Sequence, residues 1–195
     1  MGPSALHLER PLVLRVAAQE DLASCVAWMN DPQVASPLDI RPPVSLDDLR
    51  ARRLPCYNSG GKPVHDIVRL TFLVDAGGRS LGFGISYGWD RFDDVIRELD
   101  FAVRQDFTLP AWVALEGMVR LFAHTFGNED ALEIRCRTNS GRLMARLFGA
   151  LGAREVKRPI QVNLDRRSVE RRILYAVQGD VFFASRAARR ILGEP

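Results

Sequence analysis

The sequence predicts a single mixed α/β domain, of the α+β kind with a mixed sheet. Three observations support this class: a length of 195 residues, a hydrophobic content of 47 %, and the order of the predicted elements. Composition of this kind supports one sizeable core. The order reads β-α-α-β-β-β-α-β-α-β-β, which is neither a regular βαβ alternation nor an all-antiparallel meander.

The N-terminal third opens with a strand over 11–17, "PLVLRVA". Apolar residues at helical spacing follow, and Pro32 forbids the helix from continuing. Residues 35–66 are polar and rich in proline and glycine. Within them, "SLDDLRARRL" predicts a short helix that begins after Ser45.

Three strands are predicted in the centre of the chain. Residues 69–75 and 80–89 flank "AGG", a hairpin signal, and 95–103 follows after a turn. In this third strand, alternation places Leu99, Phe101 and Val103 on one face and Glu98 and Asp100 on the other. An apolar stripe then predicts a helix over 112–126 that ends at Gly127.

The remainder is predicted as a strand (131–137), a helix (142–151) stopped by Gly152, and two strands near "EVKRPIQVNL" and "RILYAVQ". A closing helix follows in "DVFFASRAARRIL". We therefore expect one domain over 1–195, with a flexible N-terminus (1–10) and a C-terminal helix (180–195).

Charge and cysteine content exclude several classes. The net charge is +3, and the three cysteines are widely spaced and odd in number, so a disulfide framework and a metal site are not expected. No apolar run is long enough to span a bilayer, and we expect a cytoplasmic protein without a membrane partner. Arginines gather in "RRSVERR" and "RAARR" without interleaved aromatic residues, which favours a solvated helix face over a nucleic-acid site.

A family resemblance depends on several stretches taken in order: "AWMNDPQVAS", "FLVDAGGRSLGFGISY" with "ELDFAV", and "LMARLFGALGARE". Together they resemble the GCN5-related N-acetyltransferases (GNAT superfamily), specifically their RimL/RimJ-like branch. The resemblance covers residues 10–178 and depends on order and spacing. It implies the acyl-CoA N-acyltransferase fold: helices flanking a mixed, mostly antiparallel sheet that splays apart between its fourth and fifth strands.

The resemblance also implies acetyl-CoA as co-substrate, bound where the sheet opens. Ala102 and Val103 would contact the pantetheine arm, and an amide near Val103 would polarise the thioester carbonyl. The turn 104–112 and the helix start after it would hold the pyrophosphate. The further cofactor candidates are Arg104, Thr108, Leu109, Ala111, Trp112, Val113, Asn139 and Arg142.

Two CoA-contacting motifs are degenerate. The pyrophosphate turn of the family is glycine-rich, whereas Leu109-Pro110-Ala111 lacks glycine and Pro110 removes an amide donor. The asparagine and the tyrosine that the family commonly carries in the later helix fall on Gly141 and Phe148. Phe148 cannot protonate a departing thiolate.

The expected chemistry needs a base that accepts a proton from an ammonium group. Glu98 is the first candidate, because it matches the strand pattern and should face the open side of the sheet, and Asp100 lies two residues on. The candidate substrate residues are Trp28, Tyr57, His65 and Trp89.

Two functions stay open at this point. The first is acetyl or acyl transfer from acetyl-CoA to a primary amine of a small molecule or peptide, by direct attack in a ternary complex. The alternative is a non-catalytic protein of this fold that has lost CoA binding and serves as a ligand- or protein-binding module. A homodimer is compatible with both, and no nucleic-acid partner is expected.

Overall fold

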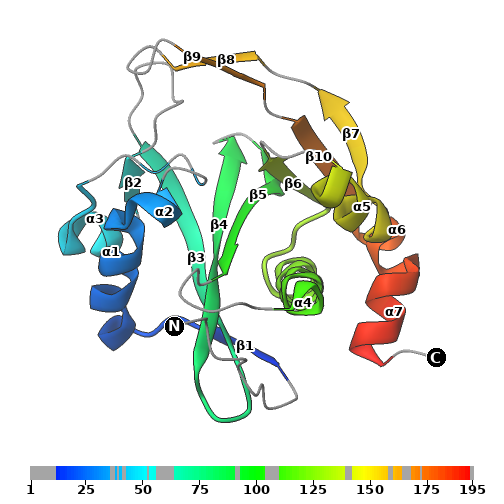
Figure 1. Cartoon of the computed structure of the whole chain (residues 1–195), viewed down its shortest axis with the longest axis horizontal. Helices are drawn as coiled ribbons and strands as arrows, with labels where there is room; N and C mark the ends of the chain where they lie inside the picture. The colour runs from blue at the N-terminus through cyan, green and yellow to red at the C-terminus, as the bar shows by residue number, and fades with distance from the viewer. Residues whose placement is uncertain are drawn as a thin grey trace, which may run out of the picture.

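A computed structural model describes residues 12–35, 38, 40, 43–51, 53–55, 64–90, 93–103, 110–138, 142–157, 160–163, 168–171 and 173–193, some by their backbone alone. A long sheet runs through the middle of the molecule, with α1, α2 and α3 on one side and α4 to α7 on the other (Figure 1). The predicted mixed α/β fold is confirmed. None of the described helices is long and apolar enough to cross a membrane.

The N-terminal half consists of β1 (Val13–Val16), η1 (Gln19–Asp21), α1 (Leu22–Asn30), α2 (Pro32–Ala35), α3 (Leu46–Arg50), β2 (Arg53–Pro55), β3 (Val64–Val74), β4 (Ser80–Asp90) and β5 (Asp93–Val103). The C-terminal half consists of α4 (Ala111–Asn128), β6 (Glu133–Thr138), α5 (Arg142–Ala150), β7 (Arg154–Lys157), β8 (Ile160–Asn163), β9 (Ser168–Arg171), β10 (Ile173–Gln178), α6 (Gly179–Ala184) and α7 (Arg186–Leu192).

The main sheet has the strand order β1-β3-β4-β5-β6-β10-β7, with β2 added on β3. All of its pairs are antiparallel except β5 with β6, which is parallel. The parallel pair is short: β5 is eleven residues long, but only Ile96, Arg97 and Glu98 pair with β6. The strands therefore part after Glu98. We call this feature the β5–β6 divergence, formed by residues 99–103 and 136–138, and it confirms the predicted splay.

Several predicted boundaries differ from the structure. The stretch "EVKRPIQVNL" forms two strands, because β7 pairs with β10 whereas β8 pairs with β9 in a separate sheet. Gly127 does not end α4, which continues to Asn128.

The prediction of a single closing helix is wrong, because two helices, α6 and α7, end the described chain. Ser185 has extended backbone angles, and its side chain accepts a hydrogen bond from the Ala188 amide, so it begins a new helix, α7. The predicted cap at Ser45 is confirmed, since its hydroxyl accepts from the Asp48 amide.

Two large apolar clusters hold the layers together. One lies between the α1–α3 side and the face of β3 and β4 that carries Phe72, Phe83 and Ile85. The other joins α4, α5, α6 and α7 to β5, β6 and β10. Gly117 lets α4 approach the sheet closely, because a Cβ there would lie 2.6 Å from Cζ of Phe101 and 2.8 Å from Cδ2 of Leu73.

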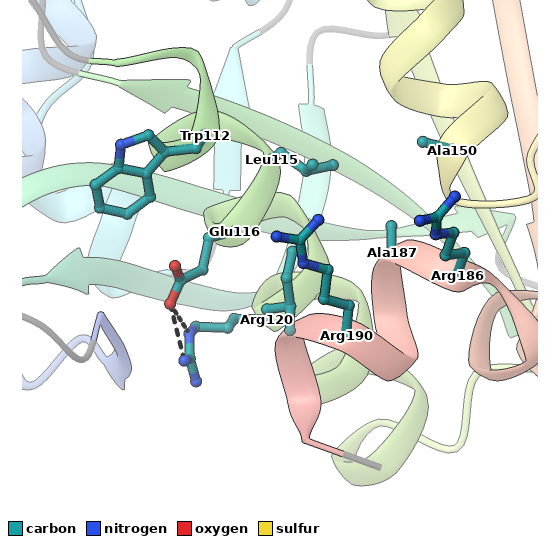
Figure 2. Close-up of a pocket in the computed structure, with 9 residues that line it drawn as sticks. Trp112, Leu115, Glu116, Arg120, Ala150, Arg186, Ala187 and Arg190 are labelled. Atoms are coloured by element: carbon teal, nitrogen blue, oxygen red, sulfur yellow. Dashed lines mark hydrogen bonds and ion pairs between the residues drawn. The ribbon is translucent and has the colours of Figure 1, made fainter. Parts of the chain in front are cut away.

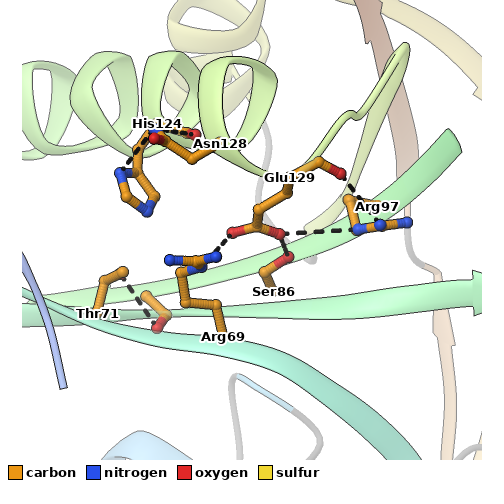
Figure 3. A network of polar contacts seen from close by, with 8 residues as sticks. Arg69, Thr71, Ser86, Arg97, His124, Asn128 and Glu129 are labelled. Carbon is orange, nitrogen blue, oxygen red and sulfur yellow. Dashed lines mark hydrogen bonds and ion pairs between the residues drawn. The ribbon is translucent and has the colours of Figure 1, made fainter. Parts of the chain in front are cut away.

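A buried polar network fixes the C-terminal end of α4 (Figure 3). The Glu129 side chain is 1 % exposed and lies between Arg69 of β3, at 3.3 Å, and Arg97 of β5, at 3.7 Å. The Ser86 hydroxyl of β4 donates to the same carboxylate at 2.5 Å. A buried charge needs such compensation. The network therefore ties the end of α4 to three strands.

Candidate active site

Glu98 and Asp100 lie at the point where β5 and β6 part. Glu98 pairs with Arg135 of β6, and it is the last β5 residue that does so. The predicted alternation is confirmed, because Leu99 packs in the cluster that contains α4 and Phe101 meets Gly117 of that helix. The two carboxylates therefore point to the opposite face of the sheet.

Glu98 is buried at this position. Its exposed fraction is 8 %. Tyr87 stands directly opposite on β4 and is 3 % exposed, and Arg135 pairs with Glu98 from β6. A strand with neighbours on both sides shields its side chains more than an edge strand does. Asp100 lies two residues beyond Glu98, the last β5 residue that pairs with β6, and is only partly buried.

Cys136 reports on the same place. Burial first, and then the nearby charges of Asp100 and Glu98, raise the pKa of the Cys136 thiol well above its usual value, although a hydrogen bond from the Leu99 backbone lowers it. The thiol is therefore protonated at neutral pH and is no nucleophile. Since both carboxylates are near enough to raise the pKa of the Cys136 thiol on β6, they both lie close to the divergence. Cys136 is a buried core residue with an exposed fraction of 6 %.

Beyond Glu98, the β6-facing edge of β5 has no strand partner in the described part of the chain. Ala102 is partly buried beside the first apolar cluster, and Val103 is described by its backbone. An unpaired strand edge can hydrogen-bond an extended ligand that carries amide groups. The divergence therefore provides backbone groups for an arm of that chemistry.

The start of α4 is capped by Pro110, which provides no side-chain acceptor. Trp112 is partly exposed, whereas Val113 is fully buried and its amide donates to the Pro110 carbonyl at 2.9 Å. The Val113 side chain is thus a core residue. Ala111 begins the helix and is described by its backbone; Arg104, Thr108 and Leu109 lie outside the described residues.

The later helix, α5, begins at Arg142, which is described by its backbone, and Asn139 lies outside the described residues. Phe148 is 3 % exposed and stacks on Tyr175 of β10, with ring centroids 4.6 Å apart. Its ring is therefore part of the core and provides neither a proton nor a cofactor contact.

Among the candidate substrate residues, Trp28 of α1 packs on Phe72 and Phe83, at 5.9 and 5.2 Å between ring centroids. Phe83 pairs with Ala102 of β5, so Trp28 lies on the sheet face of Glu98 and Asp100. His65 and Trp89 are described by their backbones, in β3 and β4, and Tyr57 lies outside the described residues.

Two features of this region were not predicted from the sequence. Tyr87 was not singled out, although counting back through the turn after β4 could have placed it opposite Glu98. The second feature is a groove of about 680 Å³ between α4, α5 and α7 (Figure 2). We call it the α4–α7 groove. Its lining residues are Trp112, Leu115, Glu116, Arg120, Ala150, Arg186, Ala187, Arg190 and Ile191.

Comparison with known proteins identifies the fold. No protein-family model matches the sequence, and no curated protein matches it. Solved structures do match. The spermidine N-acetyltransferase of Vibrio cholerae, in complex with CoA and spermine, aligns with a TM-score of 0.68 and 13 % identity, over 88 % of this chain and 98 % of that one. AAC(6')-Ib, in complex with ribostamycin and CoA, aligns with a TM-score of 0.62 and 17 % identity, over 91 % and 98 %.

These structures are acetyltransferases of the GNAT fold, and the chain shares that fold over nearly their whole length. The strand order and the parallel β5–β6 pair agree with it. Fold alone does not fix activity, so the chemistry has to be argued from the site.

Proposed function

We propose that this chain is an N-acetyltransferase that moves an acetyl group from acetyl-CoA to a primary amine. The observation that carries the proposal is the β5–β6 divergence with Glu98 and Asp100 at its apex. The solved acetyltransferases of this fold that bind CoA or acetyl-CoA support it. The sequence runs favour the RimL/RimJ-like branch, with degenerate cofactor motifs.

The donor's pantetheine arm would lie along the unpaired edge of β5 beside Ala102 and Val103. The N-terminus of α4, next to the arm, offers main-chain amides and the positive end of an eighteen-residue helix to a pyrophosphate. Because Pro110 has no amide hydrogen and the Val113 amide already has an acceptor, fewer donors remain than in a glycine-rich turn. We therefore expect CoA to bind more weakly than at such a turn.

In the proposed reaction, the Glu98 carboxylate accepts a proton from the ammonium group of the acceptor. The amine nitrogen attacks the thioester carbonyl carbon, and a C–N bond forms. A β5 amide near Val103 stabilises the charge on the carbonyl oxygen. The intermediate then loses its second N–H proton to solvent and collapses with cleavage of the C–S bond. Since the Phe148 ring is buried, the CoA thiolate takes its proton from solvent.

The acceptor would approach from the sheet face that carries Trp28 and the two carboxylates. An anionic site suits a cationic amine, and the related structures hold small acceptors of this kind, spermine and ribostamycin. We propose a small-molecule or peptide amine as acceptor.

The test is turnover. The chain is incubated with acetyl-CoA and a panel of polyamines, aminoglycosides and peptide amines, while thiol release is measured and products are identified by mass spectrometry. We expect acetylation of at least one primary amine. No acetyl-CoA binding and no turnover across the panel would instead support the non-catalytic alternative.

A further inference from the structure

The α4–α7 groove combines an apolar lining with exposed positive charge. The apolar lining residues are Leu115, Ala150, Ala187 and Ile191. Trp112 stands at one end of the groove (Figure 2). Arg186 lies at the other end beside Ala150, and Arg190 lies between them. The groove is thus long, amphipathic and within the size range of small-molecule sites, roughly 300–1,000 Å³.

The charges in the groove differ in their pairing. Arg120 is engaged by Glu116, with Nε and one terminal nitrogen at 3.0 and 2.9 Å from the same carboxylate oxygen. Within the described part of the chain, neither Arg186 nor Arg190 forms an ion pair. Both are exposed and available to an anion. Arginine is suited to phosphate, which it can contact with two parallel N–H donors.

The position of the groove links it to the candidate site. Trp112 is the second residue of α4, so the groove opens beside the helix start at which the pyrophosphate is proposed to bind. Helices α6 and α7 follow the stretch 10–178 that carries the family resemblance. The resemblance therefore implies nothing about Arg186 and Arg190.

We propose that the α4–α7 groove binds the phosphorylated adenosine end of the acyl-CoA donor, with Arg186 and Arg190 contacting phosphate and Trp112 packing on the adenine ring. The inference rests on the proposed function. In this proposal, the guanidinium groups of Arg186 and Arg190 on α7 compensate for the amide donors that the turn without glycines lacks. Stacking of a base on an aromatic side chain adds affinity.

The test compares CoA, dephospho-CoA and adenosine 3',5'-bisphosphate by calorimetric titration. The variants are Arg186→Gln, Arg190→Gln, the double variant, and Arg189→Gln as control, because Arg189 is exposed on the same helix but does not line the groove. We expect each groove substitution to weaken CoA binding about tenfold, with Arg189→Gln close to wild type. The double variant should lose more affinity for adenosine 3',5'-bisphosphate than for acetyl-pantetheine.

The outcomes separate this inference from the proposed function. If the wild type acetylates an amine and the double variant binds CoA unchanged, the groove assignment is wrong and the transferase stands. If the wild type shows no turnover but binds adenosine 3',5'-bisphosphate, and the double variant does not bind it, the groove assignment stands alone. Equal binding of that nucleotide by wild type and double variant, or none by either, overturns it.

Discussion

Glu98 of β5 and Arg135 of β6 form the last register pair before the two parallel strands part. This relationship places a carboxylate at the apex of the opening in which the donor thioester is proposed to lie. Asp100 follows on the same face, and the charges of both carboxylates raise the pKa of the Cys136 thiol. The position favours a group that transfers a proton where the two substrates meet.

Replacement of Glu98 by Gln should lower kcat by about 10²- to 10⁴-fold, the range for loss of a positioned general base. The affinity for acetyl-CoA should stay close to wild type, because the strand edge and the α4 terminus are unchanged. Steady-state kinetics over a pH series measure kcat, CoA titration measures the affinity, and a melting curve shows that the variant is folded. Glu20→Gln, on the exposed η1, is the matched control. An unchanged rate across pH would remove Glu98 as the base.

Replacement of Glu129 by Gln should destabilise the protein by about 3 kcal/mol, because Arg69 and Arg97 then lose a buried counter-charge. Chemical denaturation measures the loss. Asp47→Asn, in a pair whose carboxylate is 90 % exposed, should cost less than about 0.5 kcal/mol. Equal losses in the two variants would contradict the anchoring role of Glu129.

Gly117 and Gly149 test how closely α4 packs on the sheet. Gly117→Ala should cost about 1–3 kcal/mol, because the new methyl group would overlap Phe101 and Leu73. At Gly149 of α5 no atom lies within 4 Å of an added Cβ, so Gly149→Ala should stabilise the helix by about 0.5–1 kcal/mol. Thermal melts of the two variants should shift in opposite directions; a shift in the same direction would refute the close contact.

Cys25 makes the stability of the protein sensitive to alkaline pH. Burial is the largest cause that raises the pKa of its thiol, from 9.0 to about 11. Between pH 9 and 11 the unfolded chain releases this proton while the folded chain retains it, so rising pH favours unfolding. Stability relative to Cys25→Ala should therefore fall by up to about 1.4 kcal/mol per pH unit in this window. Urea denaturation of both proteins at pH 8, 9, 10 and 11 checks this, and a constant difference would disagree with it.

The fold and the strand that carries Glu98 could be predicted from the sequence because their signals are local. The glycine turn after β3 sets the hairpin, and two-residue alternation separates Glu98 from Leu99. The burial of Glu98 could not be predicted, since it depends on Tyr87 and on a parallel partner distant in sequence.

The α4–α7 groove was missed for a related reason. It brings Trp112 and Arg190 together, and no periodicity connects residues so far apart in the chain. The break at Ser185 was also missed, because a helical pattern continues through it and only the capping geometry separates α6 from α7.

Calorimetric titration of acetyl-CoA into the wild-type protein measures whether the β5–β6 divergence binds the donor. We expect one site per chain with a dissociation constant on the order of 10–100 μM, within the usual range of enzyme substrates and weakened by the loss of turn donors. The melting temperature should rise at saturating acetyl-CoA. No heat of binding and no thermal shift at millimolar acetyl-CoA would contradict the assignment of the β5–β6 divergence as a donor site.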